Sequence, residues 1–245
     1  MMLNQGGIVR STAQRNEKPW TRKEFREQLI AVGRNSYHDK HPFHVAMHEG
    51  ILSKEQIKGW VANRYYYQKC VPIKDAVIMS KLPSREFRRE WIQRIIDHDG
   101  NQEEQGGIEA WVKLGEAVGL SREEILREEH VVPAVRFSVD AYVTFAREKP
   151  WIEAVASSLT ELFSPLLISE RIKILERLYP WIDSSGLGYF RNRLTQAPRD
   201  TDFALKVVLD YCQTREEQQR AVDALQFKCD VLWAQLDGIE KAYPN

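Results

Sequence analysis

The 245-residue chain has only three cysteines, Cys70, Cys212 and Cys229, and they lie far apart in the sequence. They show no CxxC or other metal-ligand spacing, so we expect the reduced thiols of a cytosolic protein rather than a disulfide framework or a structural zinc site. The N-terminus is polar and lacks the apolar core of a signal peptide, and no segment approaches membrane-spanning length. These absences predict a cytoplasmic protein that does not enter a membrane.

Net charge is also lacking, because Lys and Arg total 35 and Asp and Glu total 35. A surface that binds nucleic acid depends on an excess of positive charge, so we do not expect one here. The sequence has no glycine-rich phosphate loop, no Rossmann glycine fingerprint and no GxSxG elbow. A locally positive cavity remains compatible with this composition.

Strand-type alternation is almost absent, whereas helical periodicity runs through most of the sequence. Residues 1–20 are predicted to form a flexible tail, and 21–245 a single all-α domain, because nothing in the chain resembles a linker. Ser53 and Ser121 stand where helix N-caps would, and Pro72 is expected to kink or break the third helix. The periodicity predicts helices over 21–33, 42–50, 53–81, 84–98, 106–119, 130–147, 151–164, 166–178, 187–194, 198–212 and 215–241.

One predicted helix carries polar groups on its inward stripe. Three- and four-residue steps align Ile57, Val61, Arg64, Gln68 and Val71, so that a guanidinium and an amide occupy positions where a bundle core would have Leu or Val. Burying such groups without partners costs several kcal/mol. Two interpretations stay open at this point: an internal ion pair that fixes the register of the helices, or one wall of a polar pocket.

Other helices place cationic or hydrogen-bonding groups beside their apolar stripes. Arg94 and His98 are one turn apart, Tyr189 and Arg193 are one turn apart, and Lys228 lies near the edge of the apolar stripe of the last helix. Each observation alone is more often packing than chemistry. Together they favour an interior site for a small, polyanionic ligand, since Arg binds carboxylates with two parallel hydrogen bonds.

The early histidines suggest a different kind of site. His41, His44 and His48 share one helical face at i, i+3 and i+7, which is a workable spacing for metal ligands. Di-iron bundles, however, use a Glu three residues before a His on two helices, and no His in this sequence has a Glu at that position. A metal- or haem-dependent helical oxygenase is therefore kept only as an alternative.

Several long runs resemble a known family. The sequence is similar, from about residue 35 to residue 243, to the pyrroloquinoline-quinone synthases, which carry out the last step in the biosynthesis of pyrroloquinoline quinone (PQQ). The runs that carry the resemblance, in family order, are Tyr37-His38 with His41-Pro42, 59–64 (GWVANR), 97–100 (DHDG), 106–111 (GGIEAW), 157–163 (SSLTELF) and 225–228 (LQFK).

The resemblance implies a haem-oxygenase-like helical bundle without haem, with an interior active-site cavity, usually as a homodimer. The implied reaction is ring closure and eight-electron oxidation by O2 of a bicyclic tricarboxylate precursor, which yields PQQ and hydrogen peroxide. The precursor supplies its own electron-rich chemistry, so neither a metal nor an organic redox cofactor is expected, and O2 is a co-substrate.

The resemblance also implies roles for individual residues. His98 matches the histidine that transfers protons at the reacting ring, and Tyr189 and Arg193 match the pair around the oxygen. An ordinary histidine pKa near physiological pH would suit His98 for this role. The positions that match substrate-binding residues are Tyr37, His38, Arg64, Tyr67, Gln68, Lys74, Arg94, Tyr142, Glu161, Arg171 and Lys228.

Two positions depart from the family pattern on the oxygen side. Ile168 stands where the family has a second histidine, and Asn192 stands where it has a small serine. Isoleucine can donate neither a hydrogen bond nor a proton. A paralogue that binds or carries the quinone without full turnover is therefore the second hypothesis, beside full synthase activity.

Overall fold

The computed structural model describes residues 17–244, and all regular secondary structure within them is helical. The predicted all-α class is thereby confirmed. Three short 3₁₀ segments, η2 (His38–Lys40), η3 (Ser157–Phe163) and η4 (Ser184–Leu187), connect the α-helices. The α-helices are α1 (Arg22–Ser36), α2 (Pro42–Glu49), α3 (Lys54–Lys81), α4 (Arg85–Asp99), α5 (Gly106–Ala117), α6 (Arg122–Leu126), α7 (Pro133–Glu148), α8 (Trp151–Ala156), α9 (Ser164–Leu178), α10 (Gly188–Tyr211) and α11 (Arg215–Ala242).

Capping boxes fix where four of these helices begin. In each, a Ser or Thr side chain accepts a hydrogen bond from the third residue of the helix, whose own side chain returns to the backbone of the cap. Both serines that the sequence predicts as caps have this role, so those predictions are confirmed. The four pairs are Thr21 with Glu24, Ser53 with Gln56, Ser121 with Glu124 and Thr214 with Glu217.

The two internal prolines do not end their helices. Pro72 lies inside α3, and Pro198 lies inside α10, so the two helices predicted over 187–194 and 198–212 are one helix. A proline inside a helix removes one hydrogen bond at a cost of about 3 kcal/mol, which packing along a long helix can offset. The segment predicted as one helix over 151–164 instead divides into α8 and η3, and α6 forms where no helix was predicted.

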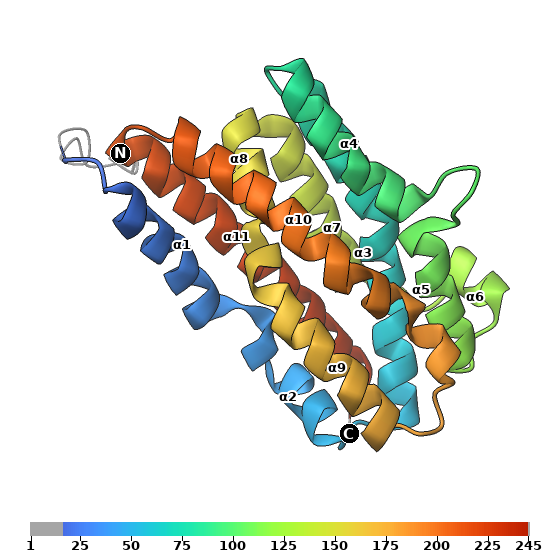
Figure 1. The fold of residues 1–245 in the computed structure, drawn as a ribbon. Coiled ribbons are helices and arrows are strands. Elements are labelled where there is room, and N and C mark those ends of the chain that lie inside the picture. Colours follow the sequence, from blue (N-terminus) through green and yellow to red (C-terminus); the bar gives the residue numbers. More distant parts are fainter. Residues whose placement is uncertain (1–16, 245) are drawn as a thin grey trace, which may run out of the picture.

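The long helices α3 and α11 run through the bundle and carry most of its packing (Figure 1). α3 packs against α4, α5 and α7, whereas α11 packs against α1, α7, α8 and η3. α9 and α10 lie side by side, and α10 also packs on η3. The apolar core forms two clusters, one around Trp60 and Trp111 and one around Trp91 and Leu225, and Tyr67 packs against both.

The predicted tail, residues 1–20, lies mostly outside the described residues. Of the part that is described, Trp20 donates its backbone N–H to Gln218 on α11 at 2.8 Å. Its ring stacks with Phe25 and lies under the Arg215 guanidinium, 3.5 Å from the ring centroid. The chain is thus held against the bundle by the residue just before the first cap.

The expectation that no segment approaches membrane-spanning length was wrong. Residues 151–178 form a 28-residue helical segment that is long and apolar enough to cross a membrane by length and composition. In the fold, 56% of its most apolar window is buried inside the protein. The segment comprises α8, η3 and α9, which the bundle packs into its interior.

Gly33 of α1 is a position where the packing needs the absence of a side chain. A Cβ placed there would lie 2.1 Å from the ring of Phe163 in η3, and that ring packs 5.3 Å from the ring of Tyr37. We expect Gly33→Ala to lower the free energy of unfolding by about 1–3 kcal/mol, because Phe163 must leave its position. Urea denaturation measures this loss.

Gly188→Ala is the matched control, because a Cβ at Gly188 meets nothing within 4 Å and the residue has no positive φ. Gly-to-Ala changes at such helical positions stabilise by about 0.4–1 kcal/mol. Equal denaturation midpoints for the two variants would show that Phe163 yields without cost.

Candidate active site

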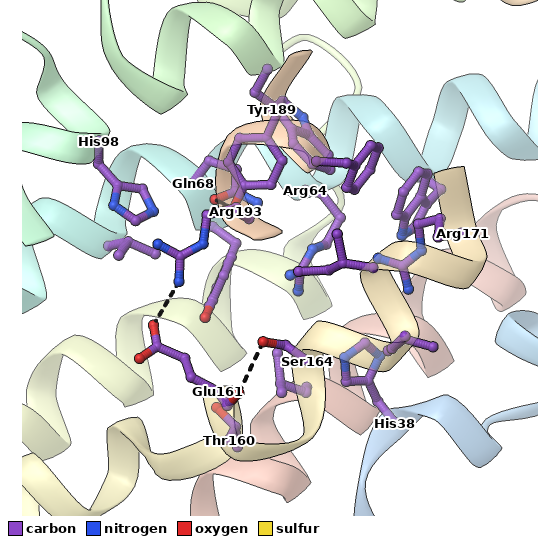
Figure 2. A pocket seen from close by; sticks show the side chains of 18 of the residues that line it. His38, Arg64, Gln68, His98, Thr160, Glu161, Ser164, Arg171, Tyr189 and Arg193 are labelled. Carbon is purple, nitrogen blue, oxygen red and sulfur yellow. Dashed lines mark hydrogen bonds and ion pairs between the residues drawn. The ribbon is translucent and has the colours of Figure 1, made fainter. Parts of the chain in front are cut away.

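An interior cavity of about 100 Å³ lies among α3, η3, α9 and α10 (Figure 2). His98 and Arg193 lie toward one end of it, and His38 and Arg171 toward the other (Figure 2). Ten of the fourteen residues predicted for the site line it. They are Tyr37, His38, Arg64, Tyr67, Gln68, His98, Glu161, Arg171, Tyr189 and Arg193.

Two cavity guanidiniums have no carboxylate partner within the described part of the chain. Arg64 donates to the amide oxygen of Gln235 at 2.8 Å and lies 4.2 Å from the Tyr67 ring centroid. The Nη2 of Arg171 lies 2.6 Å from Nε2 of His44, and its Nε is buried without a hydrogen bond. Burial lowers the pKa of Arg171 to about 10. The structure thus favours the pocket wall over the internal ion pair for Arg64.

Lys228 is a third cation without a carboxylate, in a layer behind the cavity wall. Its Nζ donates to the hydroxyl of Tyr67 at 2.9 Å and lies 3.8 Å from the ring centroid of Tyr142. Its side chain is almost fully buried. Burial, together with the charges of Arg64 and Lys74, holds the pKa of Lys228 well below its usual value. Neither Lys228 nor Tyr142 lines the cavity directly; Lys228 reaches it through Tyr67, and Tyr142 packs against Lys228.

The opposite end of the cavity is electrostatically compensated. Glu161 of η3 accepts hydrogen bonds from Arg94 at 2.6 Å and from Arg193 at 3.0 Å. Asp200 lies 3.4 Å from Arg193 and 3.7 Å from Arg94. Glu161 and Arg193 line the cavity, whereas Arg94 stands one layer behind them. These carboxylates outweigh the effect of burial and raise the pKa of Arg94 above its ordinary value.

Asp75 of α3 completes this buried network. It accepts a hydrogen bond from the neighbouring Lys74 at 2.6 Å, and its Oδ1 lies 3.5 Å from Nε of Arg94. Lys74 also reaches the hydroxyl of Ser158 at 3.3 Å. Lys74 therefore lies away from the cavity wall, like Arg94. Four predicted residues thus lie behind the cavity wall: Lys74, Arg94, Tyr142 and Lys228.

The cavity and its surroundings carry a formal excess of positive charge. Six cations, Arg64, Lys74, Arg94, Arg171, Arg193 and Lys228, face only three carboxylates, Asp75, Glu161 and Asp200. The excess of three lies on the side of Arg64, Arg171 and Lys228. A buried site of this kind selects an anion, because within residues 17–244 no carboxylate is paired with these three cations.

His98 is held in one tautomer by the backbone of its own helix. Its Nδ1 lies 3.0 Å from the carbonyl oxygen of Arg94, so Nδ1 carries the proton and Nε2 is left as an unprotonated acceptor. Burial and the charge of Arg193 lower the pKa of His98 to about 4. The expectation of a pKa near neutrality was thus wrong. In this state His98 is a neutral base.

Tyr189 is fixed as a hydrogen-bond donor inside the cavity. Its hydroxyl donates to the amide oxygen of Gln68 at 2.9 Å, and its ring packs edge-to-face on Trp111 with centroids 4.9 Å apart. Burial raises the pKa of Tyr189, so the phenol keeps its proton. Arg193, one turn further along α10, lies beside it (Figure 2).

Tyr37 and His38 close the cavity at the α1–α2 junction. Their rings meet edge-to-face with centroids 4.5 Å apart. Burial raises the pKa of Tyr37. Burial, with the charges of Arg64 and Arg171, lowers the pKa of His38 well below its ordinary value. Both side chains therefore remain neutral at physiological pH.

The two departures from the family pattern lie in different places. Ile168 lines the cavity and is only 7% exposed. Asn192 is exposed and lies in a surface groove with Asp97 and Glu103, outside the cavity. The expectation that Asn192 faces the oxygen side was therefore wrong, because α10 turns Arg193 inward and its neighbour outward. Only Ile168 changes the cavity lining.

The early histidines do not form the shared face that the sequence predicts. His41 is the N-cap of α2, where its Nδ1 accepts the N–H of Phe43 at 3.1 Å and its Nε2 lies 3.0 Å from Asp237. It therefore points away from His44 and His48. Within residues 17–244, no group of three or more His, Cys, Asp or Glu side chains is arranged to hold a metal ion.

Sequence reasoning missed several residues that shape the site. The aromatic wall of Trp60, Trp111 and Phe190 resembles ordinary core in the sequence. Asp200 had a detectable signal, since it follows Arg193 by seven residues, or two helical turns on one face. The prediction of separate helices over 187–194 and 198–212 placed Arg193 and Asp200 on different helices and so concealed that relation.

Comparisons with known proteins follow the same direction as the geometry. The sequence model of the TENA/THI-4/PQQC family matches residues 26–238. The chain belongs to the TENA/THI-4/PQQC family. Within this family, the protein named pyrroloquinoline-quinone synthase from Pseudomonas aeruginosa is 58% identical over 222 residues, 91% of this chain and 88% of the relative. The proteins of that name from Cronobacter sakazakii and Granulibacter bethesdensis are 55% and 49% identical, over 91% and 96% of this chain and 88% and 92% of theirs.

Solved structures support the fold of this family member. A domain of unknown function with a heme oxygenase-like fold from Shewanella denitrificans superposes with a TM-score of 0.71 at 14% identity, over 90% of each chain. A TenA homolog from Pseudomonas syringae superposes with a TM-score of 0.68 at 13% identity, over 93% of this chain and 98% of its own. The predictions of a haem-oxygenase-like bundle, of a resemblance to pyrroloquinoline-quinone synthases and of an enzyme of that class are confirmed.

Proposed function

We propose that the protein completes PQQ biosynthesis by closing the ring of a bicyclic tricarboxylate precursor and oxidising it by eight electrons with O2, releasing hydrogen peroxide. The observation that carries this proposal is the excess of three positive charges around an interior cavity, which matches a ligand with three carboxylates. Relatives named for this synthesis, at 49–58% identity over nine-tenths of the chain, support it independently.

The substrate's carboxylates bind the cations that have no carboxylate partner among the described residues. Arg64 and Arg171 face the cavity directly and offer paired N–H donors. Lys228 acts through the hydroxyl of Tyr67, which it polarises from 2.9 Å. A negatively charged ligand raises the pKa of Lys228 back toward its usual value, so binding and protonation of this lysine support each other.

Proton removal from the reacting ring belongs to His98. Its Nε2 is unprotonated, it is fixed by the Arg94 carbonyl, and it lies at the compensated end of the cavity. Tyr189 and Arg193 supply donors at the same end, where superoxide or peroxide develops negative charge. Gln68 orients Tyr189 because its amide oxygen accepts the hydrogen bond of the Tyr189 hydroxyl.

The proposal includes neither a metal nor an organic redox cofactor. The electrons come from the quinol-like ring of the precursor, and O2 accepts them. A homodimer in the cytoplasm is part of the proposal, and the three buried, free cysteines are consistent with that location.

A quinone-binding or carrier protein is the second candidate, and Ile168 favours it. This side chain lines the cavity where a proton donor is expected from the family pattern. Such a protein would bind PQQ in the charged cavity without consuming oxygen.

Aerobic incubation of the purified, chelator-treated protein with the precursor separates these candidates. We expect conversion to PQQ with oxygen uptake and peroxide release, and no stimulation by added iron. The Pseudomonas aeruginosa relative serves as the positive control for the precursor and the assay. Tight PQQ binding with no oxygen uptake would establish the carrier instead, and strict dependence on added iron would contradict both.

A further inference from the structure

Three histidines form a continuous chain from the cavity to the protein surface. His38 lines the cavity, His44 is 3% exposed beneath it, and His48 is half-buried at the outer end. Nδ1 of His38 lies 3.3 Å from Nδ1 of His44, and Nε2 of His44 lies 3.1 Å from Nε2 of His48. The chain reaches the end of the cavity that is remote from His98 (Figure 2).

The neighbouring arginine fixes the proton positions along this chain. Arg171 can only donate, so Nε2 of His44, 2.6 Å from its Nη2, is an acceptor and the proton of His44 is on Nδ1. The single lone pair of Nε2 of His44 is filled by Arg171, so Nε2–H of His48 donates there when Arg171 turns to a ligand carboxylate. Nδ1–H of His44 points to Nδ1 of His38. The remaining proton of His38 is then on Nε2, the nitrogen not engaged by His44.

All three rings are neutral at physiological pH, as a chain of single donors and single acceptors requires. Burial lowers the pKa of His38 and of His44 well below the ordinary value, and the charge of Arg171 adds to the effect on both. Burial and Arg171 also lower the pKa of His48, against the opposing effect of Glu170 and Asp39. These two carboxylates offset only part of the lowering at the outer end of the chain.

We propose that His48, His44 and His38 relay protons between the solvent and the end of the cavity remote from His98. Once a ligand carboxylate takes the guanidinium of Arg171, Nε2 of His44 is open to His48. A proton taken up at Nδ1 of His48 then releases Nε2–H to His44, His44 releases Nδ1–H to His38, and His38 releases Nε2–H to the bound ligand or to reduced oxygen. Only N–H, O–H and C–H bonds are made or broken, and one positive charge crosses. The passage leaves each ring in its other tautomer, from which the reverse sequence carries a proton outward. The relay rests on the proposed oxidation, which moves protons between the ring and oxygen.

The cavity geometry explains why a second route for protons would be needed. His98 has Nδ1 committed to the Arg94 carbonyl, so only its Nε2 is free to exchange a proton with the ligand. Tyr37 and Arg171 also lie at the remote end, but burial raises the pKa of Tyr37 and the pKa of Arg171 is about 10, so both keep their protons at pH 7. A histidine chain connects that end to the outside without opening the cavity to water.

The first test removes the outer member of the chain and restores it chemically. His48→Ala is expected to lower kcat at least tenfold, a modest share of what positioned proton transfer contributes, with KM and PQQ affinity unchanged. Added imidazole should enter the half-exposed space left by the His48 side chain and restore the rate. Without imidazole, the variant should show a larger solvent deuterium isotope effect on kcat than the wild type. His130→Ala is the matched control, because that surface histidine pairs only with Glu124 and lies outside the chain.

Wild-type kcat in His48→Ala, or a slow variant that imidazole does not restore, would overturn the relay. A second measurement does not depend on turnover or on a variant that folds. Long-range ¹H–¹⁵N NMR of the histidine rings should show Nε2–H for His48, Nδ1–H for His44 and Nε2–H for His38. A different tautomer or a charged ring at His44 at pH 7 overturns the relay even if the enzyme is active. Failure of the wild type to oxidise the precursor instead sinks the proposed oxidation, while these tautomers show whether the chain itself is in place.

Discussion

His98→Asn is expected to slow precursor turnover by about 100-fold or more, since positioned acid–base groups contribute roughly 10²–10⁴-fold. Asparagine can still hydrogen-bond the Arg94 carbonyl that holds His98, but it cannot accept a proton. PQQ affinity should change by less than about threefold, because the anionic groups bind at other residues. Single-turnover oxidation and fluorescence titration with PQQ measure the two quantities separately.

The His98 pKa of about 4 adds a pH signature. The folded state resists protonation that the unfolded chain accepts near pH 6.5, so this residue makes stability fall as the pH decreases from about 6.5 to about 4. His98→Asn removes that contribution and should flatten the same part of the stability profile. Unchanged turnover, or equal slopes in wild type and variant, would contradict the assigned role; His130→Asn controls for the loss of a histidine.

Arg171→Met is expected to weaken PQQ binding by about 2–5 kcal/mol, or roughly 30-fold to several thousand-fold, as for other buried charge partners of a ligand. The empty protein should be at least as stable as the wild type, because the change removes a buried cation that no carboxylate neutralises. Thermal unfolding with and without PQQ measures both effects. In Arg171→Met, PQQ should raise the melting temperature by less than it does in the wild type, whereas the melting temperature without PQQ should not fall.

Arg94→Met is the matched contrast on the compensated side. It leaves Glu161, Asp75 and Asp200 with one cation fewer, so the empty protein should lose about 3–5 kcal/mol. Loss of stability by both variants to the same extent would mean that the cavity is not divided into a compensated and an uncompensated half. Unchanged PQQ affinity in Arg171→Met would remove this arginine from the binding site.

Periodicity predicted the fold well, because most helices here bury one face and begin at recognisable caps. The stripe that contains Arg64 and Gln68 was visible at the right spacing, and both residues line the cavity. What the stripe could not show was whether Arg64 has a carboxylate partner. That depends on side chains from other helices, and here the partner is the amide of Gln235 in α11.

Directions of individual side chains were the least predictable. His41 follows the helical spacing of His44 and His48, yet it caps α2 and points to Asp237. Asn192 and Arg193 are neighbours in sequence but lie on opposite sides of the wall. Caps and helix rotation depend on contacts with α10 and α11 that a local pattern does not contain. The resemblance to a family placed residues near the site without saying which lie on the wall and which behind it.

Pro72 affects the cavity although it does not line it. Pro72 follows Gln68 by four residues, or about one helical turn. In a regular helix the N–H of residue 72 would donate to the carbonyl oxygen of Gln68, but the ring nitrogen of proline carries no hydrogen, so this hydrogen bond cannot form. The same residue therefore has two acceptors with different properties. The amide oxygen can rotate with its side chain and holds the hydroxyl of Tyr189, whereas the carbonyl keeps a direction set by the backbone and is not committed to the helical ladder.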